Sequence, residues 1–494
     1  MSGLNVRAIL SPKIFMEIEM RTYALFVFLG CFLAVPSFAA TPGAITGRWV
    51  GALDTDGQHI EIAIVFSEEE KVLAGSVDVV GIKGIPLEVI SFDPPSLKFQ
   101  FDSPAGLALF TGEKNGDEYS GTIVFPEAVG TFSVVRLIPA DMDEIISSYM
   151  KEQNIPGLAA AVLRDGEVAW MGTYGESNIS KRERVTPQTI FPLASVSKVF
   201  TATALMQLHA EGKLNLDDDV SDYLPFQVRN PNFPELPITF TQLLRHRSSI
   251  RDNPEFYSPL WSTANGDTDT ILGEFLKSYL KTEGELYDER KNFFPYKPGA
   301  DFRYCNTCYA LLGYLTERIS GMPFQQYTQK AIFKPLGLES AAWTYANVDK
   351  SFASTSYRYD PEIGHQDVGV VGYPDWPAGL LRMNANDLSR FLGAYTQFGL
   401  LEEVQIIDPS VIEFMAPKQQ AVGFYTWFSS SLNSTSDVLY THSGSDLGVR
   451  TLMGFNPSSR EAFFILINGE VELQALASQI YRAIPTLGWE KVPN

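Results

Sequence analysis

The chain has 494 residues, 45% of them hydrophobic, so it is long enough to bury large cores and to form two domains. Its formal net charge of −20 argues against nucleic acid and anionic membrane surfaces as main partners, because like charges repel. Three cysteines in a chain of this length do not make a disulfide framework.

Residues 1–40 are predicted to be an upstream extension followed by a secretory signal peptide. One arginine, an apolar run and small residues follow Met20, which is the layout of an export signal cleaved after Ala39 or Ala40. The apolar run is short and is interrupted by a glycine and a proline, which disfavours a membrane anchor. We therefore expect an exported protein, periplasmic or secreted, with no stable membrane span after cleavage. Whether Met1 or Met20 is the true start is left open.

Residues 41–138 show the period-two alternation of apolar side chains that is typical of strands. The alternation is clear over Ile60–Phe66 and Leu97–Phe101, and the pairs Asp56–Gly57 and Asn115–Gly116 favour type I′ hairpin turns between strands. We predict a small all-β domain of about eight short strands that close into a barrel or sandwich. A structural or docking role is favoured over a binding site in its mouth.

A second domain is predicted over residues 139–494. Its first helix follows Pro139, where Asp141 and Glu144 have the spacing of a capping box. A hairpin is predicted over residues 158–172, and after a mostly helical region three strands and a closing helix are predicted at 437–440, 449–455, 462–467 and 473–484. Because strands lie at both ends of this domain, we predict one mainly antiparallel sheet, built from both ends and covered by helices on both faces.

The motif Ser-x-x-Lys occurs three times, and only Ser195–Lys198 stands at the start of an apolar helical pattern. Ser148–Lys151 lies inside an amphipathic helix, where a solvated face is the expected role, and Ser278–Lys281 falls in the middle of another helix. Residues i and i+3 of a helix are neighbours, and both a lysine and the helix N-terminus favour an ionising hydroxyl. Ser195 is therefore the candidate nucleophile.

Other chemistries lack their motifs. The sequence contains neither Gly-x-Ser-x-Gly nor His-Glu-x-x-His, and its five histidines are scattered, so no metal and no cofactor are expected. The acidic run Asp217–Asp219 lacks the spaced oxygens of a calcium loop and is read as a solvated turn. For Cys305 and Cys308, a local bridge stays open, but two small buried residues are favoured.

Two further stretches complete a pattern. Tyr304-Cys305-Asn306 follows a Pro-Gly turn and precedes an apolar helix, and His442-Ser443-Gly444 opens the C-terminal strands. With Ser195–Lys198 they give Ser-x-x-Lys, Tyr-x-Asn and Lys/His-x-Gly in order. The chain thereby resembles the serine β-lactamase and penicillin-binding-protein-like hydrolases, which include class C β-lactamases, D-amino-acid peptidases and esterases. The resemblance spans about residues 140–485 and includes three flanking segments, Asn215–Pro225, Ile238–His246 and Ile332–Leu338.

The resemblance implies an α+β fold, with a β-lactamase-like antiparallel sheet, flanking helices and a helical subdomain. It also implies a role for each matching residue: Ser195 as acyl-forming nucleophile, Lys198 as its electrostatic partner, Tyr304 as general base, Asn306 as a hydrogen-bonding partner of substrate and lysine, and His442 as the lining of the far side. Gly444 lies beside the substrate, and the backbone N–H groups of Ser195 and Ser445 would form the oxyanion hole.

Elementary electrostatics permits a tyrosine base here. A tyrosine works as a base at neutral pH only if its pKa falls by ~3 units, which corresponds to ~4 kcal/mol. One ammonium about 4 Å away supplies up to ~4 kcal/mol at an effective dielectric near 20. Lys198 can therefore support Tyr304 as the base, while a neutral Lys198 that shares the task is left open. The rival motif Tyr345-Ala346-Asn347 lacks the Pro-Gly turn and the following helix.

Three departures from the family pattern bear on the substrate. His442 replaces the lysine with which β-lactamases hold an acidic antibiotic, and a neutral imidazole holds a carboxylate less well. Cys305 and Cys308 replace the usual Ser and Gly, and Ser249 stands where glycine is usual. We therefore expect an exported serine hydrolase acting on a small-molecule or peptide substrate: a small acyl ester or a D-amino-acid peptide, such as one derived from the cell wall. The alternatives are β-lactamase or penicillin-binding activity, or a catalytically silent binding protein. The sequence does not determine the oligomeric state.

Overall fold

The computed structural model of the chain describes residue 45 and residues 47–484, apart from 56–57, 70–71, 80–81, 104, 116–117, 137–141, 254, 256–265, 403, 417–427 and 431–438. The chain divides into two compact units, residues 1–139 and 140–494. Within the described residues, no helix is both long and apolar enough to cross a membrane.

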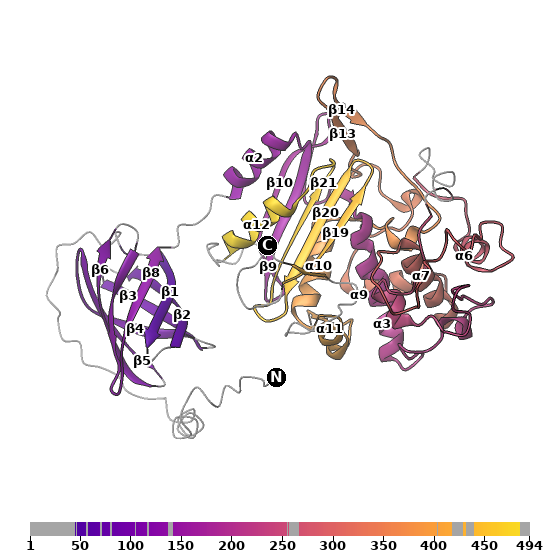
Figure 1. The fold of residues 1–494 in the computed structure, drawn as a ribbon. Coiled ribbons are helices and arrows are strands. Elements are labelled where there is room, and N and C mark those ends of the chain that lie inside the picture. Colours follow the sequence, from indigo (N-terminus) through magenta and orange to yellow (C-terminus); the bar gives the residue numbers. More distant parts are fainter. Residues whose placement is uncertain are drawn as a thin grey trace. The chain divides into compact units, whose positions relative to one another are not determined.

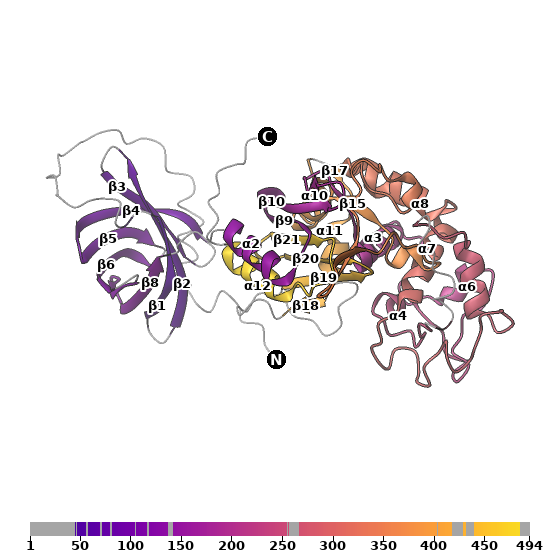
Figure 2. The same ribbon diagram turned by 90° about the horizontal axis from the view of Figure 1, so that it is seen from above.

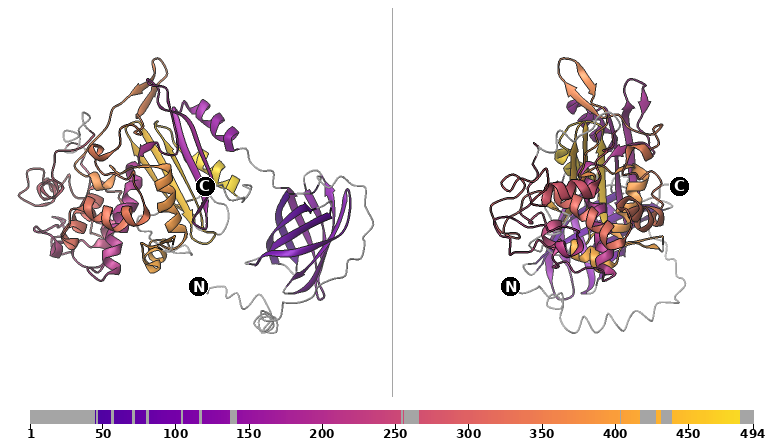
Figure 3. Two further views of the ribbon diagram at one scale, coloured as in Figure 1. Left: turned by 180° about the vertical axis from the view of Figure 1, so that it is seen from behind. Right: turned by 90° about the vertical axis from the view of Figure 1, so that its right-hand side faces the viewer.

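Eight antiparallel strands of the first unit close into a barrel in sequential order, with β1 paired to both β2 and β8 (Figures 1 and 3). Large aromatic side chains fill the interior: the rings of Phe99 and Phe110 stack at 4.5 Å, and Trp49 meets Tyr119 edge-on at 4.9 Å. The strands are β1 Gly47–Thr55, β2 Gln58–Glu69, β3 Val72–Val79, β4 Ile82–Asp93, β5 Ser96–Ser103, β6 Gly106–Asn115, β7 Glu118–Val124 and β8 Val129–Arg136. The predicted all-β barrel is confirmed.

The predicted hairpin turns of the barrel are only partly visible. Asp56, Gly57 and Gly116 lie outside the described residues. The residues around them pair as a two-residue turn requires, because Thr55 faces Gln58 and Asn115 faces Glu118 across the strands.

The second unit is built on a seven-stranded sheet in the order β11-β10-β9-β21-β20-β19-β18, in which every pair is antiparallel. The β9–β10 hairpin turns at Asp165 and Gly166, whose φ angles of 51° and 85° fit a type I′ turn. The strands are β9 Gly157–Arg164, β10 Glu167–Asn178, β11 Glu183–Arg184, β18 Phe428–Ser430, β19 Leu439–Asp446, β20 Val449–Asn456 and β21 Glu461–Ile467. The sheet therefore joins both ends of this unit, as predicted.

Helices cover both faces of the sheet, so the interior strand β9 is buried on both sides. Leu158, Ala160 and Val162 pack against α2 (Met142–Gln153) and α12 (Gln474–Ala483), which lie side by side in Figures 1 and 2. The alternate residues of β9 belong to the core formed with the other long helices, α3 Ser197–Ala210, α7 Asn306–Ser320 and α10 Ala385–Thr396. This arrangement confirms the predicted fold class.

The region between the two parts of the sheet forms the helical subdomain and several short elements. The short helices are α4 Phe240–Leu244, α6 Leu272–Leu280, α8 Phe324–Thr328, α9 Lys334–Leu336 and α11 Pro409–Met415, with a π turn η6 at Gln329–Phe333. The 3₁₀ turns are η3 Ala194–Val196, η4 Val220–Tyr223, η7 Tyr345–Asn347 and η8 Trp376–Ala378. Three small antiparallel pairs are β12 Ile190–Pro192 with β15 Arg382–Asn384, β13 Tyr357–Asp360 with β14 Gly364–Asp367, and β16 Leu400–Leu401 with β17 Val404–Gln405.

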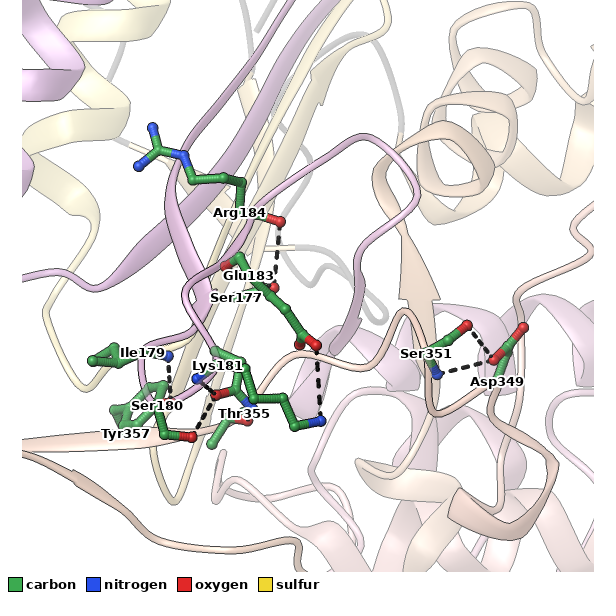
Figure 4. Close-up of polar contacts among 11 residues, drawn as sticks. Ser177, Ile179, Ser180, Lys181, Glu183, Arg184, Asp349, Ser351, Thr355 and Tyr357 are labelled. Carbon is green, nitrogen blue, oxygen red and sulfur yellow. Dashed lines mark hydrogen bonds and ion pairs between the residues drawn. The ribbon is translucent and has the colours of Figure 1, made fainter.

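Polar contacts attach the end of β10 to the segment that leads into β13 (Figure 4). The Asn178 amide donates to Thr355 Oγ1 at 2.9 Å, and the hydroxyl of Tyr357 accepts the N–H of Ile179 at 2.8 Å. These contacts tie the end of β10 to the start of β13.

One predicted boundary was wrong, and one predicted capping residue lies outside the described residues. Ser195 stands at a helix start, as predicted, in η3, the 3₁₀ turn that leads directly into α3. The strand predicted at 437–440 runs instead from Leu439 to Asp446, because backbone pairing with β20 continues through the small polar residues. Asp141 of the proposed capping box is not described.

Candidate active site

Ser195 lies in the turn between β12 and α3. The preceding residue, Ala194, has a φ of 47°, which is uncommon for a residue with a side chain and marks a strained backbone. Ala194 and Val196 are buried, whereas Ser195 is partly exposed. The turn therefore presents the Ser195 side chain to solvent at the N-terminal end of α3, where the helix dipole favours negative charge.

Lys198 is completely buried and holds the serine hydroxyl. Its Nζ donates to Ser195 Oγ at 3.0 Å and to the carbonyl oxygen of Ala378 at 2.7 Å. The same face of α3 binds the η8 segment twice more, because Thr201 Oγ1 donates to Pro377 O at 2.7 Å and Ser197 Oγ accepts the Leu381 N–H at 3.1 Å. The packing of η8 against α3 thus fixes the ammonium beside the hydroxyl.

Tyr304 lies two residues before α7 begins and is 40% exposed. Lys198 Nζ lies 4.9 Å from the centre of its ring, which is a cation–π contact. Asn306 is the first residue of α7 and is partly exposed, but its predicted bond to Lys198 is not among the described contacts. The lysine donates to Ala378 O and Ser195 Oγ instead.

Cys305 and Cys308 form a disulfide, so the favoured reading of two unlinked buried thiols was wrong. The two residues stand at i and i+3 across the first turn of α7, which brings their Cα atoms within 5.3 Å, a distance that suits a bridge. Both residues are fully buried. The bridge links the residue after Tyr304 to the second residue after Asn306. Asn306 therefore lies inside a small covalent loop, and Tyr304 is the residue just before it.

An acidic side chain that the sequence analysis missed caps α7. The carboxylate of Asp252 accepts the backbone N–H groups of Asn306 at 2.6 Å and Thr307 at 2.9 Å, and the Thr307 hydroxyl at 2.6 Å. A negative charge at a helix N-terminus stabilises the helix. Asp252 therefore fixes the start of α7, and with it the position of Asn306.

His442 lies in β19 and is buried as a neutral imidazole. Its Nδ1 lies 2.9 Å from the carbonyl oxygen of Ser443, and since a carbonyl only accepts, Nδ1 carries the proton. Burial, and then the positive charge of Lys198, lowers the pKa of His442 to about 3. The neutral ring predicted from the sequence is thus the form that this environment favours.

Gly444 brings β19 against the chain segment that precedes the serine. A Cβ at this position would lie 2.2 Å from Thr451 Oγ1 and 2.5 Å from the carbonyl oxygen of Leu193, so only glycine fits. Thr451 Oγ1 also donates to Leu193 O at 2.8 Å, which fixes the same approach from β20. Along β19, His442 and Gly444 are buried, whereas Ser445 is exposed.

Two more residues near Lys198 were missed. His246 was noted only as part of a flanking segment, yet it is buried against Tyr304 with ring centres 4.4 Å apart. Asp375, which leads into η8, is buried as well. Burial raises the pKa of its carboxyl to about 7; the negative charge of Asp252 also raises this pKa, and the positive charge of Lys198 lowers it. Nothing in the sequence around Asp375 signals this proximity, because it depends on how η8 packs on α3.

The competing motifs have structural roles. Ser148 and Lys151 are exposed on α2, and Ser278 Oγ accepts the Leu286 N–H where α6 ends. The second Tyr-x-Asn forms η7, where the Ala346 N–H donates to Asp267 at 2.8 Å.

The acidic run is likewise engaged with protein groups, since Asp218 accepts the Asn215 N–H and the Tyr223 hydroxyl, and Asp219 pairs with Arg229. In the described part of the chain, no group of three His, Cys, Asp or Glu residues is arranged to hold a metal.

Comparison with known proteins agrees with this geometry. The family model described as Beta-lactamase matches residues 142–486. Among curated proteins, Protein flp of Staphylococcus aureus (strain N315) is 26% identical over 254 residues, which is 51% of this chain and 47% of that protein. The putative penicillin-binding protein PbpX of Bacillus subtilis (strain 168) is 29% identical over 262 residues, 51% of this chain and 57% of that protein. The chain therefore spans about half the length of the curated relatives it matches.

Solved structures share the fold of the second unit. The octameric penicillin-binding protein homologue from Pyrococcus abyssi has a TM-score of 0.56 and 25% identity, covering 70% of this chain and 76% of that one. A class C β-lactamase from Rhodobacter sphaeroides has a TM-score of 0.53 and 23% identity, covering 70% and 98%. The D-amino acid amidase from Ochrobactrum anthropi SV3 has a TM-score of 0.55 and 19% identity, covering 70% and 97%. The last two show the fold alone.

Proposed function

Since the chain belongs to the β-lactamase family, we propose that it is a serine hydrolase that forms an acyl-enzyme at Ser195 on an ester or amide substrate. The observation that carries the proposal is the 3.0 Å hydrogen bond from Lys198 Nζ to Ser195 Oγ. A buried cation beside a partly exposed hydroxyl stabilises the alkoxide form of that hydroxyl, which is the attacking nucleophile.

The proposed reaction has two halves. Ser195 Oγ attacks the carbonyl carbon of the substrate, and its proton passes to a base, either the phenolate of Tyr304 or a neutral Lys198. The tetrahedral oxyanion is bound by the backbone N–H groups of Ser195 and Ser445, and its collapse releases an alcohol or amine that takes up the proton. Water then attacks the acyl ester with the same base and frees Ser195.

Two observations bear on which base acts. Lys198 is the described hydrogen-bond partner of Ser195 Oγ, which supports a direct role for the lysine. Tyr304 is half-exposed and presents its ring to the ammonium, so a phenolate there would be stabilised by the same charge. We therefore keep Tyr304 as the proposed base, with the charge of Lys198 stabilising its phenolate. In the alternative route, a neutral Lys198 takes the serine proton itself.

The proposed substrates are a small acyl ester or a D-amino-acid peptide, including one derived from the bacterial cell wall. The neutral, buried His442 supports the uncharged acyl ester over an acidic β-lactam, since an uncharged imidazole attracts a carboxylate less than a lysine does. The name of one structural neighbour, a D-amino acid amidase, supports the D-amino-acid peptide, whereas the name of the putative penicillin-binding protein PbpX supports the β-lactam alternative. Export to the periplasm or the medium, through the predicted signal peptide, would bring the enzyme to such substrates.

The test of the nucleophile uses the chain from residue 41 and a fluorophosphonate probe, which labels activated serines. We expect the wild type to be labelled and Ser195→Ala to be unlabelled. Ser148→Ala is the matched control, because it removes the serine of a Ser-x-x-Lys motif on the exposed face of α2 and should leave labelling unchanged. Equal labelling of Ser195→Ala and wild type would refute the assignment.

The test of the substrate class compares a short-chain p-nitrophenyl ester, a D-Ala-D-Ala peptide and a chromogenic cephalosporin. Turnover of the ester or the peptide that is lost in Ser195→Ala supports the proposal. Turnover of the cephalosporin alone would replace it with a β-lactamase function. A wild type that neither reacts with the probe nor turns over any of the three would favour the silent binding protein.

A further inference from the structure

His246 holds the loop that carries Tyr304, although the proposed reaction gives it no chemical step. It follows α4 and is 1% exposed. We propose that His246 is a positioning residue that fixes Tyr304 over Lys198. The inference rests on the proposed function, because it assigns His246 a role only through the general base.

The first support is a pair of backbone hydrogen bonds on either side of Tyr304. The carbonyl oxygen of His246 accepts the N–H of Arg303 at 2.8 Å, and its Nδ1 accepts the N–H of Cys305 at 3.0 Å. One residue thus binds the backbone both before and after the tyrosine. Together the two bonds restrict the φ and ψ angles that set the direction of the Tyr304 side chain.

The second support is the contact between the rings. The imidazole lies 4.4 Å from the Tyr304 ring with the planes 22° apart, which is a stacked pair. Lys198 Nζ lies 4.9 Å from the same tyrosine ring. The phenol is therefore bounded by the histidine as well as by the ammonium, and a shift of the histidine would move it relative to Lys198.

The third support is the charge state of His246. A backbone N–H can only donate, so Nδ1 must be unprotonated to accept from Cys305, which places the ring proton on Nε2. Burial first, and then the nearby Lys198 and His442, lower the pKa of His246 well below its ordinary value. The groups around the ring thus favour the neutral form in which the bond to Cys305 exists.

The backbone of His246 suggests the substitution that tests this role. Its φ of 54° lies in the left-handed region, which asparagine tolerates better than most residues. In asparagine, Oδ1 is as many bonds from Cα as Nδ1 is in histidine, so His246→Asn keeps an acceptor for the Cys305 N–H. His246→Phe keeps an aromatic ring against Tyr304 but has no acceptor, and His246→Gln moves the acceptor one bond further out.

The experiment measures the rate at which the fluorophosphonate phosphonylates Ser195 with loss of fluoride, as the readout of serine attack in the acylation step, together with kcat and KM on the p-nitrophenyl ester. The proteins compared are these three variants, wild type and Tyr304→Phe. Because misplacement of a catalytic group by about 1 Å slows the reaction, we expect His246→Phe to lower the acylation rate at least ~10-fold with KM changed less than ~3-fold. His246→Asn should recover most of the rate, and His246→Gln should resemble His246→Phe. If circular dichroism shows that His246→Phe does not fold, the acylation rates of His246→Asn and His246→Gln test the role of His246 instead.

The outcomes separate this inference from the proposed function. Normal acylation in His246→Phe beside slow acylation in Tyr304→Phe would overturn the role of His246 and leave the function standing. Equal impairment of His246→Asn and His246→Gln would overturn it too, because the position of the acceptor would then not matter. A wild type that is not acylated would remove the proposed function, and this role with it.

Discussion

Lys198 Nζ lies 3.0 Å from Ser195 Oγ, and the ammonium reaches the hydroxyl from a fully buried position. Its two described hydrogen-bond acceptors, Ser195 Oγ and the Ala378 carbonyl, are both uncharged. Burying a cation against neutral partners costs free energy, which a protein optimised only for stability would avoid. Such an arrangement is typical of a functional site, where a strained or costly group is kept for its chemistry.

Lys198→Met should therefore separate activity from stability. We expect the acylation rate to fall roughly 10²–10³-fold, since the charge that stabilises the alkoxide is lost. The free energy of unfolding should stay within about 2 kcal/mol of wild type, because the relief of a buried charge offsets the lost bond to Ala378 O. Fluorophosphonate kinetics and urea unfolding measure the two quantities. Wild-type acylation in this variant would contradict the role of Lys198.

The pH dependence of acylation between pH 5 and 8 should contain no step from His442. With a pKa of about 3, the buried imidazole stays neutral throughout this range. In the unfolded chain the pKa is ~6.5, so this group destabilises the native state only as the pH falls from ~6.5 towards 3. Acylation rates of wild type and His442→Gln should thus run parallel from pH 5 to 8. A step near pH 6 that only the wild type shows would mean that His442 titrates in the working range.

Asp375 should make the protein less stable as the pH rises. Its pKa is about 7 in the native state, against ~3.9 in the unfolded chain, so the native state keeps a proton that the unfolded state has lost. Stability is then lost at up to about 1.4 kcal/mol per pH unit, which amounts to about 2 kcal/mol between pH 5 and 7. Asp375→Asn removes this loss. Urea unfolding at pH 5 and pH 8 measures the free energy of unfolding of both proteins. We expect the variant to be more stable relative to wild type at pH 8 than at pH 5. An equal difference in unfolding free energy at the two pH values would contradict the raised pKa.

The features that follow from local pattern could be predicted from the sequence. Alternating apolar residues predict the strands of the barrel, and the Asp165–Gly166 turn follows from the preference of that pair for positive φ. The resemblance to a known family, carried by three motifs in order, implies which serine, tyrosine and histidine gather. Lys198 does meet Ser195 and Tyr304, as the spacing and the resemblance imply.

The features that depend on long-range packing could not be predicted. Asp375 lies within electrostatic reach of Lys198 and of Asp252, which comes from a loop far away in the sequence, and no pattern around either aspartate signals it. The effect of Ser249 also needed the structure: its φ of 66° explains why glycine suits this position, and its hydroxyl accepts a hydrogen bond from the buried Asn230 amide at 2.8 Å. Side-chain partners of this kind depend on tertiary contacts, which a single sequence does not encode locally.

Gly444→Ala should disturb the serine turn. The added Cβ would lie 2.5 Å from Leu193 O and 2.2 Å from Thr451 Oγ1, so β19 or the Leu193 segment must move. We expect a loss of about 1–3 kcal/mol in unfolding free energy and a loss of acylation. Gly469→Ala is the matched control, because it also adds a methyl group at a buried glycine, but its nearest neighbour is Pro156 Cδ at 3.3 Å. Equal effects in urea unfolding and acylation for both variants would contradict a special fit at Gly444.

Reduction of the Cys305–Cys308 disulfide should destabilise the native state modestly. The bridge closes a loop of only one helical turn, for which the chain-entropy estimate is about 2 kcal/mol. The matched control is the double variant Cys305→Ser with Cys308→Ser, in which serine at 305 remains a good N-cap for α7. A phosphine reductant should lower the free energy of unfolding of the wild type, measured by urea unfolding, by about that amount. It should leave the unfolding free energy of the double variant unchanged. In the chain from residue 41, which lacks Cys31, both remaining cysteines are fully buried, so free thiols should be detected in the wild type only after reduction and unfolding. Thiols that react in the native, unreduced protein would contradict the bridge.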